Sequence, residues 1–186
     1  MHSKSYRFLT PLIMVLTWAN MEAQTSHPVP RLVVNVTIDQ LRTDYMEAFS
    51  SLFGAGGFNK VMRDGRSYMD AAYPFSHIDR ASAVACIMTG TVPYDNGIVG
   101  EHWMDRKTLR PMYCVDDATC EGWLTSEKYS PVALNVSTVT DELKMATGGR
   151  ALVYSIAPDA DAAILAAGHA ADGAFWIDNA SGQWSS

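Results

Sequence analysis

The sequence has 186 residues, of which 48% are hydrophobic and 18% are charged, and its formal net charge at neutral pH is -6. This composition is typical of a globular protein with one sizeable core, so we expect one domain or part of one. The acidic balance argues against a broad nucleic-acid-binding face, although it permits a local basic pocket for a small phosphate.

The N-terminus has the order of a secretory signal peptide. Lys4 and Arg7 precede the apolar stretch Phe8–Ala19, and small residues follow it. The apolar stretch is too short to span a bilayer. We therefore expect a signal peptide at 1–23, a linker at 24–31, export to the periplasm or the cell exterior, and no transmembrane segment after cleavage.

The next segments indicate β-α-β connections. The run 31–38 is apolar and rich in β-branched residues, which predicts a central parallel strand buried on both faces. Asp39 follows it, and would either face a site at the carboxyl edge of the sheet or cap the next helix. Short helices are expected at 45–53 and 57–63, and a second strand at 67–73.

The stretch 73–98 is the one around which the chain is organised. Residues 81–88 are small and apolar except for one serine, which predicts a helix buried in a layered core. Asp79 is the expected N-cap, and Arg80 is then the first helical residue, where the macrodipole favours an anion and disfavours a cation. Arg80 therefore either attracts an anionic ligand or pairs with a carboxylate of the protein.

The second half of the chain continues the alternation of helices and strands. We expect an irregular excursion from the core at about 101–133, which begins with a hairpin. The segments beyond it are predicted as a helix at 134–147, a strand at 150–156, a helix at 161–167 and a strand at 174–178. Because the sequence stops soon after this strand, we expect it to be part of a longer chain.

The three cysteines divide into two kinds. Cys86 lies within the predicted apolar helix, where it is expected to be a small buried hydrophobic residue. Cys114 and Cys120 lie in a polar loop. In an exported protein these two are expected to be close enough to form a disulfide.

Several short motifs, in order and at the right spacing, resemble the exported phosphatases and nucleotide pyrophosphatase/phosphodiesterases of the alkaline phosphatase superfamily. The resemblance runs from about residue 32 to residue 184. The motifs are the strand ending in Asp39, Gly-Gly-Phe at 56–58, Ala-Tyr-Pro at 72–74, Met-Thr-Gly-Thr-Val-Pro at 88–93, Gly-Ile-Val-Gly at 97–100, Ala-Ile-Leu-Ala-Ala-Gly-His at 163–169 and Ala-Phe-Trp-Ile-Asp at 174–178.

The resemblance implies a fold, a reaction and a cofactor. The fold is α/β, with a mostly parallel central sheet, helices on both faces, and an incomplete C-terminal part. The reaction is hydrolysis of a small phosphate ester, with two Zn²⁺ ions and a Thr or Ser nucleophile at a helix N-terminus. Asp39 matches the first metal ligand, and the other ligands would lie beyond residue 186, because one carboxylate does not hold two zinc ions.

Four positions depart from the family pattern. The nucleophile position falls on Arg80, which has no nucleophilic oxygen. An Asn that helps to bind phosphoryl oxygens falls on Glu101, and a Lys and an Arg fall on Asp159 and Asp161. These carboxylates have the wrong charge for a phosphate dianion.

Two explanations follow from these departures. The site has moved, with Ser76, Asp79 or Ser82 as the nucleophile and Arg80 holding the anion, or the domain has kept its fold and lost the reaction. Ser76 is otherwise a loop cap, and Ser82 a hydroxyl bonded to a preceding carbonyl. A third possibility is that the protein acts on sulfate or phosphonate esters. The sequence does not predict an oligomeric state.

Aromatic and histidine side chains offer weaker candidates. Trp103 and Trp123 would form a substrate platform or cover the core. His77, His102 and His169 are possible metal ligands, but they lack the spacing of a metal motif and are otherwise loop or core residues.

Overall fold

The computed structural model describes residues 29–186, so the predicted signal peptide and most of the predicted linker lie outside the described residues. The chain divides into two units, of which the first ends at Val33 and the second comprises Val34–Ser186. Residues 29–33 of the first unit are exposed and contain no helix or strand. No helix in the described part of the chain is long and apolar enough to cross a membrane.

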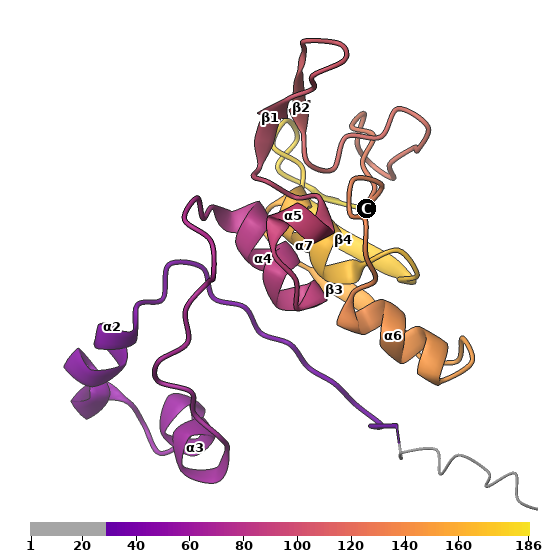
Figure 1. Cartoon of the computed structure of the whole chain (residues 1–186). Coiled ribbons are helices and arrows are strands. Elements are labelled where there is room, and N and C mark those ends of the chain that lie inside the picture. The colour runs from indigo at the N-terminus through magenta and orange to yellow at the C-terminus, as the bar shows by residue number, and fades with distance from the viewer. Residues whose placement is uncertain (1–28) are drawn as a thin grey trace, which may run out of the picture. The chain divides into compact units, whose positions relative to one another are not determined.

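Short helices and strands make up the second unit (Figure 1). Its helices are α2 (Thr43–Ala48), the 3-10 turn η1 (Ser50–Leu52), α3 (Gly57–Asp64), α4 (Arg80–Thr89), α5 (Pro93–Asn96), α6 (Val139–Ala146) and α7 (Ala160–Ala167). Its strands are β1 (His102–Met104), β2 (Pro111–Tyr113), β3 (Tyr154–Ile156), β4 (Gly173–Ile177) and β5 (Trp184–Ser185). The predicted helices are therefore present, with boundaries shifted by a few residues.

The two strands predicted before α4 are wrong. Residues 31–38 contain no strand, and their apolar side chains are exposed, with Leu32 at 79%. Residues 67–73 form turns and coil. A strand requires a partner that completes its hydrogen-bond ladder, and neither segment pairs with any strand of residues 29–186.

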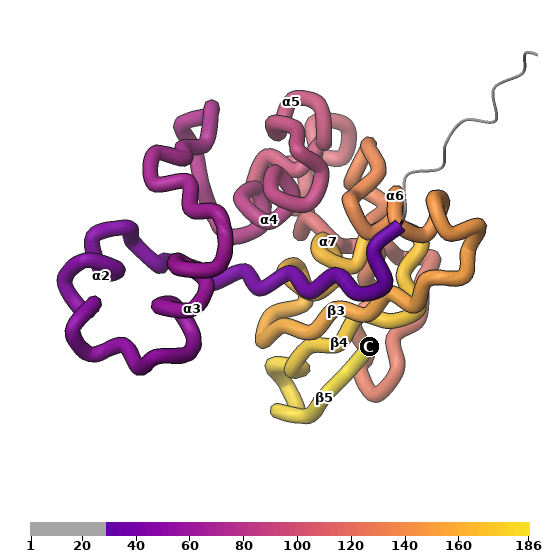
Figure 2. Tube along the Cα trace, turned by 90° about the horizontal axis from the view of Figure 1, so that it is seen from below, coloured from indigo at the N-terminus to yellow at the C-terminus, as the bar shows by residue number. Residues whose placement is uncertain are grey.

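The core is layered around α7. This helix packs on α4 with one side and on β3 and β4 with the other, as Figures 1 and 2 both show. Strands β3 and β4 are parallel, and α7 connects them, while β5 pairs with β4 in the antiparallel direction. Buried alanines on α4 and α7, among them Ala81, Ala85 and Ala163, allow the two helices to approach closely.

The predicted hairpin and the predicted excursion are both present. Strands β1 and β2 pair in the antiparallel direction. Residues 114–133 are irregular apart from an isolated bridge between Asp116 and Tyr129. Backbone hydrogen bonds in both directions between Trp123 and Ser186, at 2.6 and 3.2 Å, attach the excursion to the end of β5.

The predicted disulfide is wrong, because the structure has Cys86, Cys114 and Cys120 as free thiols. Cys114 is fully buried in the core. The Sγ atom of Cys120 instead contacts Asp117 Oδ2 at 3.3 Å. The two cysteines are six residues apart in sequence, but the side chain of Cys114 lies in the core and that of Cys120 contacts a surface carboxylate.

The reactivity of the two thiols provides a test. Burial raises the pKa of the Cys114 thiol, and nearby carboxylates raise it further, so little reactive thiolate forms. A thiol-reactive probe is expected to modify Cys120 in the native protein and Cys114 only after unfolding. Mass spectrometry of the labelled chain measures both, and equal native labelling, or a disulfide between them, would contradict the structure.

A buried carboxylate organises the start of α6. Thr138 is the N-cap, and Asp141 Oδ2 accepts its amide hydrogen at 2.9 Å and its hydroxyl hydrogen at 2.8 Å. The same oxygen lies 3.1 Å from His169 Nδ1, and Oδ1 accepts the Ala170 amide at 2.8 Å. Asp141 therefore fastens α6 to the loop that follows α7.

Asp141→Asn is expected to lower the free energy of unfolding by about 1–3 kcal/mol at neutral pH, because charged hydrogen bonds are lost. Burial alone would raise the pKa of Asp141, but these hydrogen bonds outweigh it and the pKa is lowered. The contribution is therefore complete above about pH 4 and disappears as the pH falls through the folded-state pKa. Urea unfolding from pH 3 to 7 measures it, with the exposed neighbour Glu142→Gln as the control. A pH-independent difference between wild type and Asp141→Asn would refute the assignment.

Candidate functional site

The site begins at the N-terminus of α4, where Asp79 is the N-cap as predicted. Asp79 Oδ1 accepts the Ser82 amide hydrogen at 2.9 Å, and the Asp79 amide donates to Ser82 Oγ at 3.0 Å. This is a capping box, which satisfies two backbone donors reciprocally. Ser82 is fully buried and its hydroxyl also donates to Asp79 Oδ1 at 2.8 Å.

The second oxygen of Asp79 connects this helix to the start of the hairpin. Asp79 Oδ2 accepts the Glu101 amide hydrogen at 2.6 Å. Burial alone would raise the pKa of Asp79, but the hydrogen bonds from Ser82 and Glu101 outweigh it and the pKa is lowered. The carboxylate approaches so closely that a Cβ atom at Gly100 would lie 3.0 Å from Oδ2, which explains the glycine.

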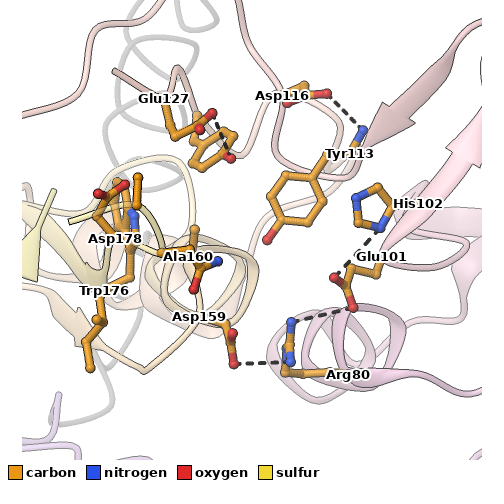
Figure 3. A pocket seen from close by; sticks show the side chains of 14 residues that line it. Arg80, Glu101, His102, Tyr113, Asp116, Glu127, Asp159, Ala160, Trp176 and Asp178 are labelled. Carbon is orange, nitrogen blue, oxygen red and sulfur yellow. Dashed lines mark hydrogen bonds and ion pairs between the residues drawn. The ribbon is translucent and has the colours of Figure 1, made fainter. Parts of the chain in front are cut away.

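Three carboxylates surround the guanidinium of Arg80, and Figure 3 shows two of them, Glu101 and Asp159. Asp161 makes the most extensive contact, with distances of 3.0 Å to Nη2 and 3.1 and 3.2 Å to Nε. Asp159 lies 3.1 Å from Nη1. Glu101 lies 3.5 Å from Nη2. The side chain of Asp161 is fully buried, whereas those of the other two are partly exposed.

The charges of this Arg80 cluster do not balance. One guanidinium faces three carboxylates, so the formal charge of Arg80, Glu101, Asp159 and Asp161 together is -2. Burial would lower the pKa of Arg80, but the hydrogen bond and charge of Asp161, followed by the other carboxylates, raise it. Arg80 therefore stays protonated. The sequence left open whether Arg80 attracts an anionic ligand or pairs with carboxylates of the protein, and the structure shows the pairing.

Tyr113 is a member of the site that the sequence analysis missed. Its hydroxyl oxygen accepts the Asp161 amide hydrogen at 3.2 Å, and its ring stacks on His102 with the centroids 4.8 Å apart. Burial raises the pKa of Tyr113, and the negative charge of Asp161 raises it further. The end of β2 is thereby joined to the start of α7.

A cavity of about 510 Å³ lies beside the Arg80 cluster. Carboxylates and aromatic rings dominate its walls. The lining residues are Arg80, Glu101, His102, Tyr113, Asp116, Glu127, Tyr129, Asp159, Ala160, Trp176, Ile177, Asp178, Asn179 and Ala180. Neither Trp103 nor Trp123 is among them, since Trp103 packs against the core and Trp123 is exposed.

The structure does not bring the other predicted site residues into this cluster. Asp39 is exposed in a turn, and Ser76 is exposed in a bend. Within residues 29–186, no three His, Cys, Asp or Glu side chains are grouped so that they could hold a metal ion. The donors among residues 29–186 alone therefore do not fit a site for two zinc ions.

Replacing Arg80 by Ala is expected to lower the free energy of unfolding by about 3 kcal/mol, because the buried carboxylate of Asp161 loses its counter-charge. The double variant Arg80→Ala/Asp161→Ala should cost less than the sum of the single variants. Urea denaturation measures both effects. The exposed pair Arg63–Asp64, 2.7 Å apart, is the matched control, and Arg63→Ala should cost less than about 1 kcal/mol. Additive losses at Arg80 and Asp161 would exclude the proposed coupling.

Comparison with known proteins places the chain in a family. Residues 33–184 match the model of the type I phosphodiesterase / nucleotide pyrophosphatase family. The chain is 40% identical over 158 residues to alkaline phosphatase PhoV of Synechococcus elongatus, covering 83% of this chain and 29% of that protein. It is 32% identical over 182 residues to alkaline phosphatase PafA of Elizabethkingia meningoseptica, covering 96% of this chain and 33% of PafA.

Solved structures agree with the sequence relationship. The crystal structure of wild-type PafA superposes with a TM-score of 0.74 at 31% identity, over 86% of this chain and 31% of that one. A structure of PafA with substitutions at one threonine, one asparagine, one lysine and one arginine gives a TM-score of 0.73 at 34% identity. The predicted fold class is thus confirmed, and the chain spans about a third of the length of these relatives. The chain is similar to alkaline phosphatases, and it belongs to the type I phosphodiesterase / nucleotide pyrophosphatase family.

Proposed function

We propose that the whole protein hydrolyses small phosphate mono- or diesters in a metal-dependent reaction outside the cytoplasm. The family match over residues 33–184, together with 40% identity to an alkaline phosphatase, is the observation that carries this proposal. Asp39 would be one metal ligand, and the remaining ligands would come from the part of the whole protein that follows residue 186. When bound, the metal ions would activate the nucleophile and stabilise charge on the phosphoryl group.

The described residues narrow the choice of nucleophile. Arg80 has no nucleophilic oxygen, and the capping box engages both Asp79 and Ser82. Ser82 is also fully buried and therefore closed to a substrate. Ser76 is exposed, four residues before Arg80. We therefore assign the nucleophile of a relocated site to Ser76.

This geometry supports an anion-holding role for Arg80 less well than it supports a structural role. Its N–H groups already face three carboxylates, and an incoming phosphate would have to displace at least one of them. The formal charge of -2 on the cluster would also repel the phosphate. The contacts support a structural role, in which Arg80 neutralises part of the charge of the carboxylates around it.

The same cluster favours a second candidate function, a catalytically silent binding or structural protein with the family's fold. Arg80, Glu101, Asp159 and Asp161 replace the nucleophile and three phosphate-binding residue types that the family resemblance implies. In the structure the three carboxylates are paired with Arg80, so the guanidinium is not free to bind a phosphate. This mutual pairing indicates an alternative arrangement that is stable without a phosphate.

Assays of the whole protein with zinc on p-nitrophenyl phosphate and bis-p-nitrophenyl phosphate separate the two candidates. If the protein is a hydrolase with a relocated site, the wild type turns over, chelation of zinc abolishes turnover, and Ser76→Ala lowers kcat at least about a thousandfold. Ser51→Ala, another exposed serine, is the control. Turnover unaffected by Ser76→Ala would remove the assignment of Ser76.

A wild type without turnover on either ester would contradict hydrolysis and support the silent candidate. In that case the fourfold variant Arg80→Thr/Glu101→Asn/Asp159→Lys/Asp161→Arg, which restores the family's residue types, is expected to gain activity. Arg80→Thr alone should gain far less, because three carboxylates would then remain against the substrate. Circular dichroism of each variant confirms that it is folded.

A further inference from the structure

We infer that the cavity beside the Arg80 cluster is a binding site for an organic ammonium ion. Two independent features of its walls lead to this inference, namely an excess of negative charge and a continuous row of aromatic rings. The inference does not depend on whether the protein hydrolyses phosphate esters, because it concerns binding alone.

The charge of the walls is strongly negative. The lining contains five carboxylates, Glu101, Asp116, Glu127, Asp159 and Asp178, and Arg80 is the only Lys or Arg among the lining residues. Arg80 also neutralises the buried Asp161, which lies behind the wall and is its most extensive partner. Glu101 and Asp159 of the lining also pair with Arg80, whereas Asp116, Glu127 and Asp178 form no ion pair among the described residues. The lining as a whole has a formal charge of -4, which favours a cationic ligand over an anionic one.

The aromatic row crosses the same cavity. His102 stacks on Tyr113 at 4.8 Å between centroids, Tyr113 meets Tyr129 edge-to-face at 5.3 Å, and Tyr129 lies 6.1 Å from Trp176. All four residues are among those that line the cavity, where Trp176 is buried, Tyr113 and Tyr129 are partly buried and His102 is exposed. Ring faces attract cations through their quadrupoles, and quaternary ammonium groups in particular bind to clusters of aromatic rings.

The carboxylates are held apart in a way that disfavours a metal ion. Asp116 accepts the Tyr113 amide at 2.9 Å, and Asp178 accepts hydrogen bonds from Ser181 at 2.6 and 2.8 Å. Glu127 accepts the Tyr129 hydroxyl at 3.1 Å. Among the described residues, no three possible ligands converge on one point. A large cation with diffuse charge satisfies separated carboxylates and ring faces better than a compact ion does.

The size of the cavity agrees with this assignment. A volume of about 510 Å³ lies within the range of small-molecule pockets, roughly 300–1,000 Å³. Figure 3 shows Glu127 and Asp178 on one side of the cavity and Glu101 and Arg80 on the other, with the ring of Tyr113 between them. A small ammonium compound can therefore contact a ring face and carboxylates from two sides.

Isothermal titration calorimetry of the whole protein with tetramethylammonium chloride tests the inference, with uncharged tert-butanol as a ligand of similar shape. We expect saturable binding of tetramethylammonium that weakens at high salt, and no saturable binding of tert-butanol. Glu127→Gln and Tyr129→Leu should each weaken binding about tenfold. Tyr129→Phe, which keeps the ring, should bind nearly as well as the wild type. Asp95→Asn, an exposed carboxylate on α5, is the control for a general charge effect.

Several outcomes would overturn the inference. They are the absence of saturable binding, equal binding of tert-butanol, an equal loss in Asp95→Asn, and unchanged affinity in both Glu127→Gln and Tyr129→Leu. Tight binding of Ca²⁺ that excludes tetramethylammonium would show a metal site instead. Tyr129→Phe and Glu127→Gln are mild substitutions at incompletely buried positions, so a folding defect is not expected to obscure the result.

Discussion

The structure around the site depends on the ion pair between Arg80 and Asp161. Arg80 is the first residue of α4, and Asp161 lies in the first turn of α7, so their contact fixes the starts of the two helices that pack together in the core. A fully buried carboxylate is costly unless a counter-charge and hydrogen bonds accompany it. The Arg80 guanidinium supplies the charge, and the Asp161 amide binds Tyr113, which adds the hairpin to the same point.

The parts of the fold that the sequence predicted correctly depend on local signals. The Asp79 cap, the apolar run of α4 and the turns around the later strands are encoded within a few residues of each element. The strand predictions at 31–38 and 67–73 failed because strand formation depends on a distant partner, which local composition does not report. The disulfide prediction failed for a similar reason, since sequence separation does not give side-chain direction, and Cys114 points into the core.

The site could be predicted only in part. The family resemblance identifies Arg80, Glu101, Asp159 and Asp161 as changed positions, and it implies that the three carboxylates have the wrong charge for phosphate. The position of Arg80 at the start of its helix predicts either an anionic ligand or a carboxylate partner for it. The structure shows that the three carboxylates are partners of Arg80. The sequence already contains a signal of this pairing, because one changed position holds a cation and the other three hold carboxylates. The aromatic row had no such signal, because Tyr113, Tyr129 and Trp176 come from β2, the excursion and β4.

Mutual pairing also means that these four positions act as one unit. Removal of the Arg80 charge alone leaves three carboxylates together, one of them fully buried, so the cost of that change is greater than the loss of one contact. Conversely, a cation introduced at Asp159 or Asp161 alone would face Arg80 at short range. Arg80→Thr, Asp159→Lys and Asp161→Arg, each made alone, therefore place like charges together, whereas Glu101→Asn alone lowers the negative charge of the cluster. The four positions are electrostatically coupled, so the effect of an exchange at one of them depends on the residues at the other three.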